Sequence, residues 1–425
     1  MSQDSRWQFA LFPAVTMSLG WGLRGYIGGG PLGAMIPGAL VAMAICLLLR
    51  RGDPAAAVAA AFGAVGIGFG GQETYGQTVG HIVKPETFWL GLIGLSLKGA
   101  VWGLLGGAVL GYALDTGRPA RKPLFVSAAL MVFGTWLGWK WINDPKLIYF
   151  SNRFDKPRVE LWAGLALGAL LWLAYLASRG EGKVAGRFAM WGALGGGIGF
   201  GGGGCLMSAG TIYQWARGWI GWWKVMELFF GFSFGLALGL CAYSLRDRLR
   251  SSAPPPAGTA GPAWTSLAFA VLICAGTFAL VWGLPVRFDY TVAGALLLCL
   301  VLFADEWAWY VALIVTATAF YADWAIYYSR TWQVGSAPVG WGVALIASLA
   351  TWWAAWVRMR RQRPFLAFGF LLLLWTSTGV SCFKMCMRGW PEPAGLLQES
   401  VFVLMAGYLT WVVTRGVRSE VHRVP

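Results

Sequence analysis

Apolar runs separated by short polar segments extend along almost the whole chain. A run of about twenty apolar residues is long enough to cross the hydrocarbon core of a bilayer as one α-helix. The pattern therefore predicts an all-α, polytopic integral membrane protein. About fourteen membrane-spanning helices are expected, with the approximate limits 9–27, 31–49, 55–71, 88–114, 123–142, 159–178, 186–206, 220–244, 263–283, 289–304, 306–324, 337–357, 364–383 and 395–414.

One polar, proline-rich stretch interrupts this series of spans. Residues 251–262 read SSAPPPAGTAGP, a composition typical of a linker. We therefore expect spans one to eight over residues 1–250, a cytoplasmic linker over 251–262, and spans nine to fourteen over 263–425.

Short patterns recur along the spans. The hexapeptide GIGFGG occurs at 66–71 and again at 197–202, each time near the end of an odd-numbered span. Three even-numbered spans share a glutamate eight residues before a glycine, at Glu160, Glu227 and Glu399. This repetition predicts that the fold is built as about seven helical hairpins in parallel orientation.

Glycine spacing indicates close helix packing. Gly103 and Gly107 follow the small-xxx-small pattern, which lets helix backbones approach each other. The clusters at 28–30, 66–71 and 195–204 are also expected to loosen or break their helices near the outer face. The letters GIGFGG fit a dinucleotide-binding fingerprint, but that motif requires a βαβ unit, so nucleotide binding is not expected.

Composition and charge support the membrane assignment. Hydrophobic residues make up 57% of the chain and charged residues 12%, which excludes the disordered and nucleic-acid-binding classes. The side that holds both termini carries nineteen of the 33 Lys and Arg residues, which predicts cytoplasmic termini in a plasma (inner) membrane. Residues 143–158 run against this rule, because they carry four basic residues on the predicted outer side. Either this segment escapes the rule or the span count is wrong there.

Charged groups inside membrane spans are costly, and they mark functional sites by default. The candidates all lie at or near the predicted outer ends of the spans. The candidate substrate- or ion-binding residues are Glu227, Glu160, Glu73, Arg24, His81, Gln77, Lys98, Lys224, Arg217 and Glu399. The sequence assigns no catalytic residue and no metal site, and no cofactor is expected.

Several of these candidates admit two interpretations. Glu227 has Lys224 one turn earlier on the same helix face, so the pair is either a proton or cation site or an interfacial anchor. The polar run 72–78, followed by His81, is either a binding or catalytic loop or a solvated turn. Arg24 either holds an anionic group or reaches toward lipid headgroups.

The first functional hypothesis is a transporter or flippase that moves a small charged or lipid-linked substrate through a polar vestibule facing the extracytoplasmic side. Glu160, Glu227 and Glu399 are expected to share that vestibule, with Arg24 or Arg217 as an anion clamp. The alternatives are a membrane-embedded transferase or hydrolase acting on a lipid or lipid-linked substrate at the outer face, and a structural subunit of a membrane complex. Membrane lipids are expected partners in each case.

Overall fold

The computed structural model describes residues 5–25, 30–117, 120–152, 155–251, 336–360, 365–386 and 392–421, and single positions between 268 and 325. All regular elements within these residues are helices. The first group comprises α1 (Arg6–Arg24), α2 (Gly30–Leu49), α3 (Asp53–Gly70), α4 (Gly76–Ile82), the 3-10 turn η1 (Pro85–Thr87), α5 (Phe88–Thr116), α6 (Arg121–Gly138), the π-helical turn η2 (Trp139–Asn143), α7 (Trp162–Ser178), α8 (Lys183–Ile212), α9 (Trp222–Ser244) and α10 (Arg246–Ser251). The second group comprises α14 (Ala337–Arg360), α15 (Leu366–Cys386) and α16 (Pro393–Val421).

The structure confirms an all-helical protein within the described residues. Seven of the described helices are long and apolar enough to cross a membrane. Eleven of the predicted spans each overlap a described helix. The span predicted at 289–304 and the linker from residue 252 onward lie outside the described residues, and of the spans predicted at 263–283 and 306–324 only single positions are described. The total of fourteen spans and the sevenfold hairpin repeat therefore stay predictions.

Local sequence explains where several helices begin and end. The Ser5 hydroxyl caps α1 by accepting the Trp7 N–H at 3.3 Å. Pro54 lies in the first turn of α3, where its missing N–H costs nothing. Gly117 ends α5 with φ 65°, a conformation that favours glycine.

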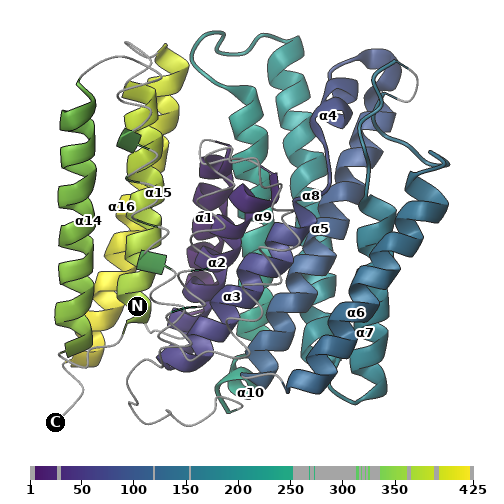
Figure 1. Cartoon of the computed structure of the whole chain (residues 1–425). Helices are drawn as coiled ribbons and strands as arrows, with labels where there is room; N and C mark the ends of the chain where they lie inside the picture. Colours follow the sequence, from purple (N-terminus) through teal and green to yellow (C-terminus); the bar gives the residue numbers. More distant parts are fainter. Residues whose placement is uncertain are drawn as a thin grey trace.

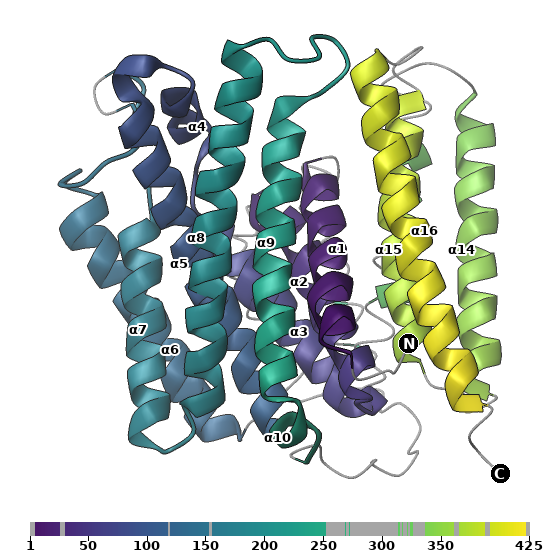
Figure 2. The ribbon, with the colours of Figure 1, turned by 180° about the vertical axis from the view of Figure 1, so that it is seen from behind.

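The helices lie side by side between two ends of the molecule, which we name by the short helices found there. The α4 end carries α4 and the connecting residues 144–152, 155–161 and 213–221, and the α10 end carries α10 and the connection 179–182 (Figure 1). The first residues of α1 and the last of α16 both lie toward the α10 end (Figures 1 and 2). Because α6 and α7 are separate helices, residues 143–152 and 155–158 of the basic segment lie at the end opposite Arg250, as the predicted span order requires.

Glycines bring helix backbones into direct contact at two interfaces. Between α5 and α8, a Cβ atom on Gly103 would overlap the carbonyl of Gly192. Between α1 and α9, Gly235 lies against the backbone carbonyl of Pro13. Small residues at such crossings remove the side chains that would hold the helices apart.

The expected helix break at 195–204 is wrong, because α8 continues without interruption from Lys183 to Ile212. The glycines of this cluster pack against α5 and α9 instead, and that packing outweighs the low helix propensity of glycine. At 66–71 the helix does end, since Gly70 is the last residue of α3. In the third cluster, residues 28 and 29 lie outside the described part of the chain, and α2 begins at Gly30.

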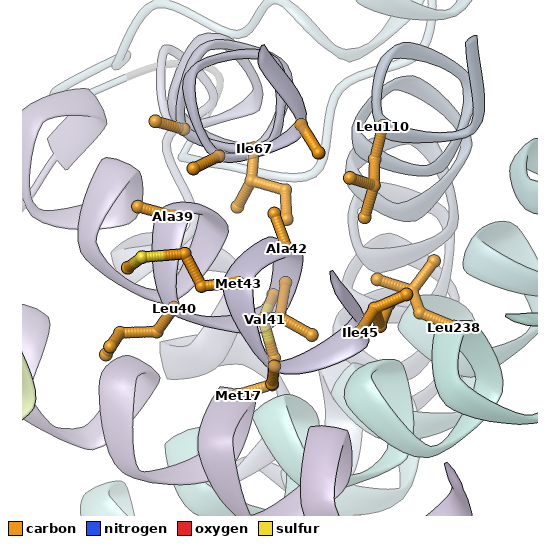
Figure 3. Close-up of a cluster of buried hydrophobic side chains, with 14 of the residues drawn as sticks. Met17, Ala39, Leu40, Val41, Ala42, Met43, Ile45, Ile67, Leu110 and Leu238 are labelled. Atoms are coloured by element: carbon orange, nitrogen blue, oxygen red, sulfur yellow. The ribbon is translucent and has the colours of Figure 1, made fainter. Parts of the chain in front are cut away.

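An apolar core fills the bundle between the α4 end and the α10 end. Figure 3 shows Met17, Leu40, Val41, Leu110 and Leu238, from α1, α2, α5 and α9, converging on one cluster of buried side chains. Leu110 lies twelve residues beyond Lys98 along α5, which corresponds to about 18 Å of helix rise. The core therefore lies well below the polar groups of the α4 end.

The second group of helices contacts the first through α15 and α16, which lie against α1 and α2 (Figures 1 and 2). Asp53, in the first turn of α3, accepts the backbone N–H groups of Phe365 and Leu366 at 2.8 and 3.0 Å and so caps the start of α15. Near the other end, the ring of Phe402 lies against Gly22.

Candidate functional site

Lys98, on α5, is the centre of a fully buried polar cluster. Its Nζ atom lies 2.9 Å from Glu73 Oε1 and 2.7 Å from Glu160 Oε1, and the exposed fraction of these side chains is 2% or less. The same nitrogen donates to the Thr78 hydroxyl at 2.9 Å and to the Thr74 carbonyl at 2.7 Å. Four oxygen atoms thus surround one ammonium group inside the bundle.

The connection between α6 and α7 supplies Glu160. Sequence placed Glu160 inside a span, but α7 begins at Trp162, so the residue belongs to the preceding extended segment. Its carboxylate accepts the Ser151 hydroxyl at 2.8 Å and the Phe150 N–H at 3.2 Å. Glu73 accepts the N–H of Leu161 at 2.6 Å. The connection therefore folds back into the bundle, and both carboxyl groups depend on it for position.

The cluster holds one cation and two carboxyl groups, and this sets its protonation. Burial raises the pKa of Glu73 from 4.5 to about 7, and the negative charge of Glu160 acts in the same direction, against the opposing effects of Lys98 and the Leu161 N–H. A cluster with a single negative charge in excess, shielded from water, is suited to bind one proton near neutral pH.

Segment 74–78 is fastened to the α6–α7 connection by polar contacts. Gln77 Nε2 donates to the Lys156 carbonyl at 2.8 Å, and Gln77 Oε1 accepts the Asn152 N–H at 2.9 Å. The Thr74 hydroxyl donates to the Val159 carbonyl at 2.8 Å. Residues 76–82 form α4, and Gln77 ties it to the neighbouring connection, so this run is not simply a solvated turn; its role as a binding or catalytic loop stays a prediction.

His81 lies at the C-terminal end of α4, close to this cluster. Partial burial lowers its pKa, and the nearby Lys84 and Lys98 lower it further. The neutral imidazole therefore dominates near pH 7. The described hydrogen bonds place its backbone carbonyl, which accepts the Thr87 hydroxyl at 3.0 Å, in the α4–η1 turn.

Glu227, on α9, forms a second buried network. Its side chain pairs with Lys224 Nζ at 2.6 Å, so the spacing of the two residues does bring them together. It also accepts the Trp223 indole N–H at 3.0 Å and the Tyr75 hydroxyl at 3.2 Å. Lys224 in turn donates to the Gly22 carbonyl near the end of α1 at 3.0 Å.

Tyr75 links the two networks. It lies two residues after Glu73 in the segment between α3 and α4, and its hydroxyl reaches Glu227. Its ring packs edge-on against Phe200 at 5.0 Å and stacks on Trp223 at 6.0 Å. Residues 73–75 therefore connect the Lys98 cluster on α5 to the Glu227 network on α9.

Arg24, the last residue of α1, is buried beside Tyr75 with an exposed fraction of 5%. Its guanidinium carbon lies 4.9 Å from the ring centre of Trp21, 5.3 Å from that of Trp102 and 5.4 Å from that of Tyr75. Within the described structure, its Nε and Nη1 atoms have no hydrogen-bond partner. Since α1 ends short of the level that α8 and α9 reach, this charge lies inside the bundle and not at its rim (Figures 1 and 2).

The remaining two candidates form their described hydrogen bonds with residues outside these networks, although the positive charge of Lys224 acts on Glu399. Glu399, on α16, is buried and accepts the Ser381 hydroxyl at 3.1 Å and the Gln398 amide at 3.3 Å, across the α15–α16 contact. Arg217 is exposed in the turn between α8 and α9, where it donates to Gln214 at 3.3 Å. Glu160 and Glu227 are thus joined through residues 73–75, whereas hydrogen bonds place Glu399 in a separate contact.

Sequence reasoning missed the aromatic partners of the site. Trp21 precedes Arg24 by three residues and Trp102 follows Lys98 by four, spacings that place each pair on one helix face. That spacing was the available signal. The indole of Trp102 is fixed by a hydrogen bond to the Ile67 carbonyl at 2.7 Å, which holds the ring in place beside Arg24.

Comparison of the chain with protein-family models, curated proteins and solved structures gave no match. The described residues also contain no group of three or more His, Cys, Asp or Glu side chains placed to hold a metal ion.

Proposed function

We propose that the protein is a membrane transporter that moves a small charged substrate and couples this movement to protons, with Glu73, Lys98 and Glu160 as the proton site. The observation that carries the proposal is the Lys98 cluster, in which two carboxyl groups share one ammonium group at 2.9 and 2.7 Å within a bundle of apolar helices. Lys98 lies in the candidate membrane-spanning helix α5, where a buried charge is expensive, and proton relays of pumps and transporters are a principal reason to retain such a charge.

The burial of these carboxyl groups favours transport over chemistry at the membrane surface. Glu73 and Glu160 are 4% and 1% exposed, and the α6–α7 connection covers both. A general base for a lipid substrate at the outer face would need to reach that substrate within hydrogen-bond distance. A small substrate suits these enclosed groups better than a lipid-linked one.

The apolar core gives the proposed transport cycle its closed side. Among the described residues, Met17, Leu110 and Leu238 are fully buried in one apolar cluster (Figure 3), which we take as the closed part of the bundle in this conformation. We assign the α4 end to the extracytoplasmic side, in keeping with the basic residues predicted at the cytoplasmic side. Transport then requires a second conformation in which the core contacts separate.

Uptake into vesicles from a mixture of small molecules tests this proposal. Full-length protein in liposomes loaded at about pH 8 is diluted into a small-molecule metabolite extract at about pH 6, two values on either side of the raised Glu73 pKa. Mass spectrometry then identifies the compounds inside. We expect at least one charged compound to accumulate above the level in protein-free liposomes. Accumulation of none, under either direction of the pH gradient, would refute transport.

Three variants separate the proton site from transport itself. Glu73→Gln and Glu160→Gln are expected to abolish accumulation driven by the pH gradient while leaving exchange between internal and external substrate. Glu86→Gln is the matched control, because Glu86 is an exposed carboxylate on η1 near the same end. If both cluster variants accumulate substrate as the wild type does, the cluster is not the proton site even though the protein transports.

A further inference from the structure

We infer that Arg24, enclosed by Trp21, Tyr75 and Trp102, is the binding site for the carboxylate group of a small monocarboxylate. This inference rests on the proposed function, because it names the class of substrate. The geometry that carries the inference is a buried guanidinium with the centres of three aromatic rings at 4.9, 5.3 and 5.4 Å from its carbon atom. The N–H groups of Nε and Nη1 find no hydrogen-bond acceptor among the described residues.

A buried guanidinium without a hydrogen-bonded anion is an incomplete arrangement. Arg cannot discharge itself by losing a proton, so the cost of burying its charge has to be offset by partners. The three rings offset part of this cost through cation–π attraction, which is strongest for a desolvated pair. The rings cannot accept in-plane hydrogen bonds from Nε and Nη1, so the N–H groups of these two buried nitrogens have no acceptor among the described residues.

The neighbouring charges leave Arg24 available for a ligand. On α9, Lys224 donates to the Gly22 carbonyl near the end of α1, and it is paired with Glu227 at 2.6 Å. Tyr75 faces Arg24 from the α3–α4 segment, and its hydroxyl is engaged by Glu227. On α2, Gly33 packs directly against the backbone of Arg24, so that neighbour supplies no charge.

The charge count of the connected networks fits a ligand with one negative charge. Three cations, Arg24, Lys98 and Lys224, accompany the three carboxyl groups of Glu73, Glu160 and Glu227. When the Lys98 cluster holds a proton, the networks carry one positive charge in excess, and one monoanion neutralises it. Charge neutrality matters most in a region shielded from water.

A carboxylate matches the recognition groups better than a spherical anion does. Arg presents its N–H groups in a rigid plane, and a planar carboxylate can accept from two neighbouring nitrogens of that plane, either Nε with Nη2 or Nη1 with Nη2. The aromatic rings on three sides favour a ligand whose remainder is small and partly apolar. Acetate and pyruvate are therefore suitable probes for the site.

Ligand-dependent thermal stability tests this inference on the full-length protein in detergent. Unfolding is followed by tryptophan fluorescence at about pH 6, below the raised Glu73 pKa. The concentration of sodium acetate or sodium pyruvate is increased, and sodium chloride at equal ionic strength is the reference. We expect a saturable rise of the midpoint temperature with both monocarboxylates. Its absence in the wild type would overturn the inference without any variant.

Variants assign the effect to Arg24. Arg24→Gln is expected to lose the rise, and Arg24→Lys to retain a weakened one, because the charge remains but the planar fork does not. Arg217→Gln is the control, since Arg217 is an exposed arginine at the same end. A rise that persists in a folded Arg24→Gln protein places the carboxylate elsewhere and overturns the inference.

Further arms distinguish other anions and the pH coupling. Inorganic phosphate and phosphatidylglycerol micelles replace the monocarboxylate, and a saturable rise with either one alone overturns the proposed class. The rise is expected to shrink at about pH 8 because the Lys98 cluster then loses its proton. His81 on α4 and Tyr149 in the α6–α7 connection also interact electrostatically with this cluster. In Glu73→Gln, a rise that is equal at the two pH values attributes the pH effect to the cluster, whereas a rise that still falls with pH contradicts the charge count.

The two proposals fail separately. Binding of acetate through Arg24 without uptake of any compound into vesicles overturns transport and leaves the carboxylate site. Uptake restricted to compounds that lack a carboxylate, unaffected by Arg24→Gln, overturns the carboxylate site and leaves transport.

Discussion

Replacing Glu73 by Gln is expected to remove a pH-dependent loss of stability from the folded protein. Burial holds the pKa of Glu73 at about 7, against 4.5 for an ordinary glutamate. Each tenfold change in an ionisation constant is worth about 1.36 kcal/mol, so this difference corresponds to about 3 kcal/mol. Because the folded state binds the proton more tightly than the unfolded chain, the stabilising contribution of Glu73 is complete below pH 4.5 and is lost as the pH rises through about 7.

The measurement is the difference between wild type and Glu73→Gln in detergent, followed by tryptophan fluorescence on heating at a series of pH values. Gln resembles the protonated carboxyl group, so the variant is expected to lose about 3 kcal/mol less than the wild type between about pH 5 and pH 8. Comparing the two proteins cancels groups that titrate in both, such as His81. Glu86→Gln, at an exposed carboxylate, serves as the control and should follow the wild type. Parallel pH profiles for wild type and Glu73→Gln would show that Glu73 is ionised across the whole range, which contradicts a pKa raised by burial.

Two further substitutions test packing and the link between the networks. Gly103→Ala is expected to destabilise the protein by about 1–3 kcal/mol, because its Cβ would overlap the Gly192 carbonyl. Gly186 lies on α8 as well, but a Cβ there would meet nothing within 4 Å, so Gly186→Ala is expected to be neutral or to stabilise the protein by up to about 1 kcal/mol. Equal effects of the two variants on thermal unfolding would contradict the packing. Tyr75→Phe is expected to cost about 1 kcal/mol of stability through its lost hydrogen bond to Glu227, and an unchanged midpoint temperature would show that this bond contributes nothing.

The helices follow from the sequence more directly than the site does. Apolar runs suffice to predict where helices lie, since every described span depends on a local pattern of about twenty residues. The Lys224–Glu227 pair is also local, because residues three apart share a helix face. The sequence therefore predicts both the class of the fold and one of its buried ion pairs.

The Lys98 cluster could not be predicted in the same way. Lys98 and Glu160 are 62 residues apart in sequence, and the α6–α7 connection has to fold back into the bundle before they meet. The wrong prediction for α8 has a related cause. The low helix propensity of glycine predicts a break, but the glycines of α8 pack against α5 and α9, and this tertiary contact keeps the helix continuous. Candidate residues were identifiable by their cost in a membrane, and their partners were not.

The short segment from Glu73 to Tyr75 gives the two proposed binding events a physical connection. A proton on Glu73 removes one of the two charges that hold Lys98, while a carboxylate at Arg24 binds beside the ring of Tyr75. These residues are two positions apart on one short segment, and the Thr74 carbonyl between them accepts directly from Lys98. A shift of this segment at either site therefore changes contacts at the other, and each ligand favours the arrangement in which the total charge is neutral. Coupling of this kind needs no long pathway through the bundle, because one segment belongs to both sites.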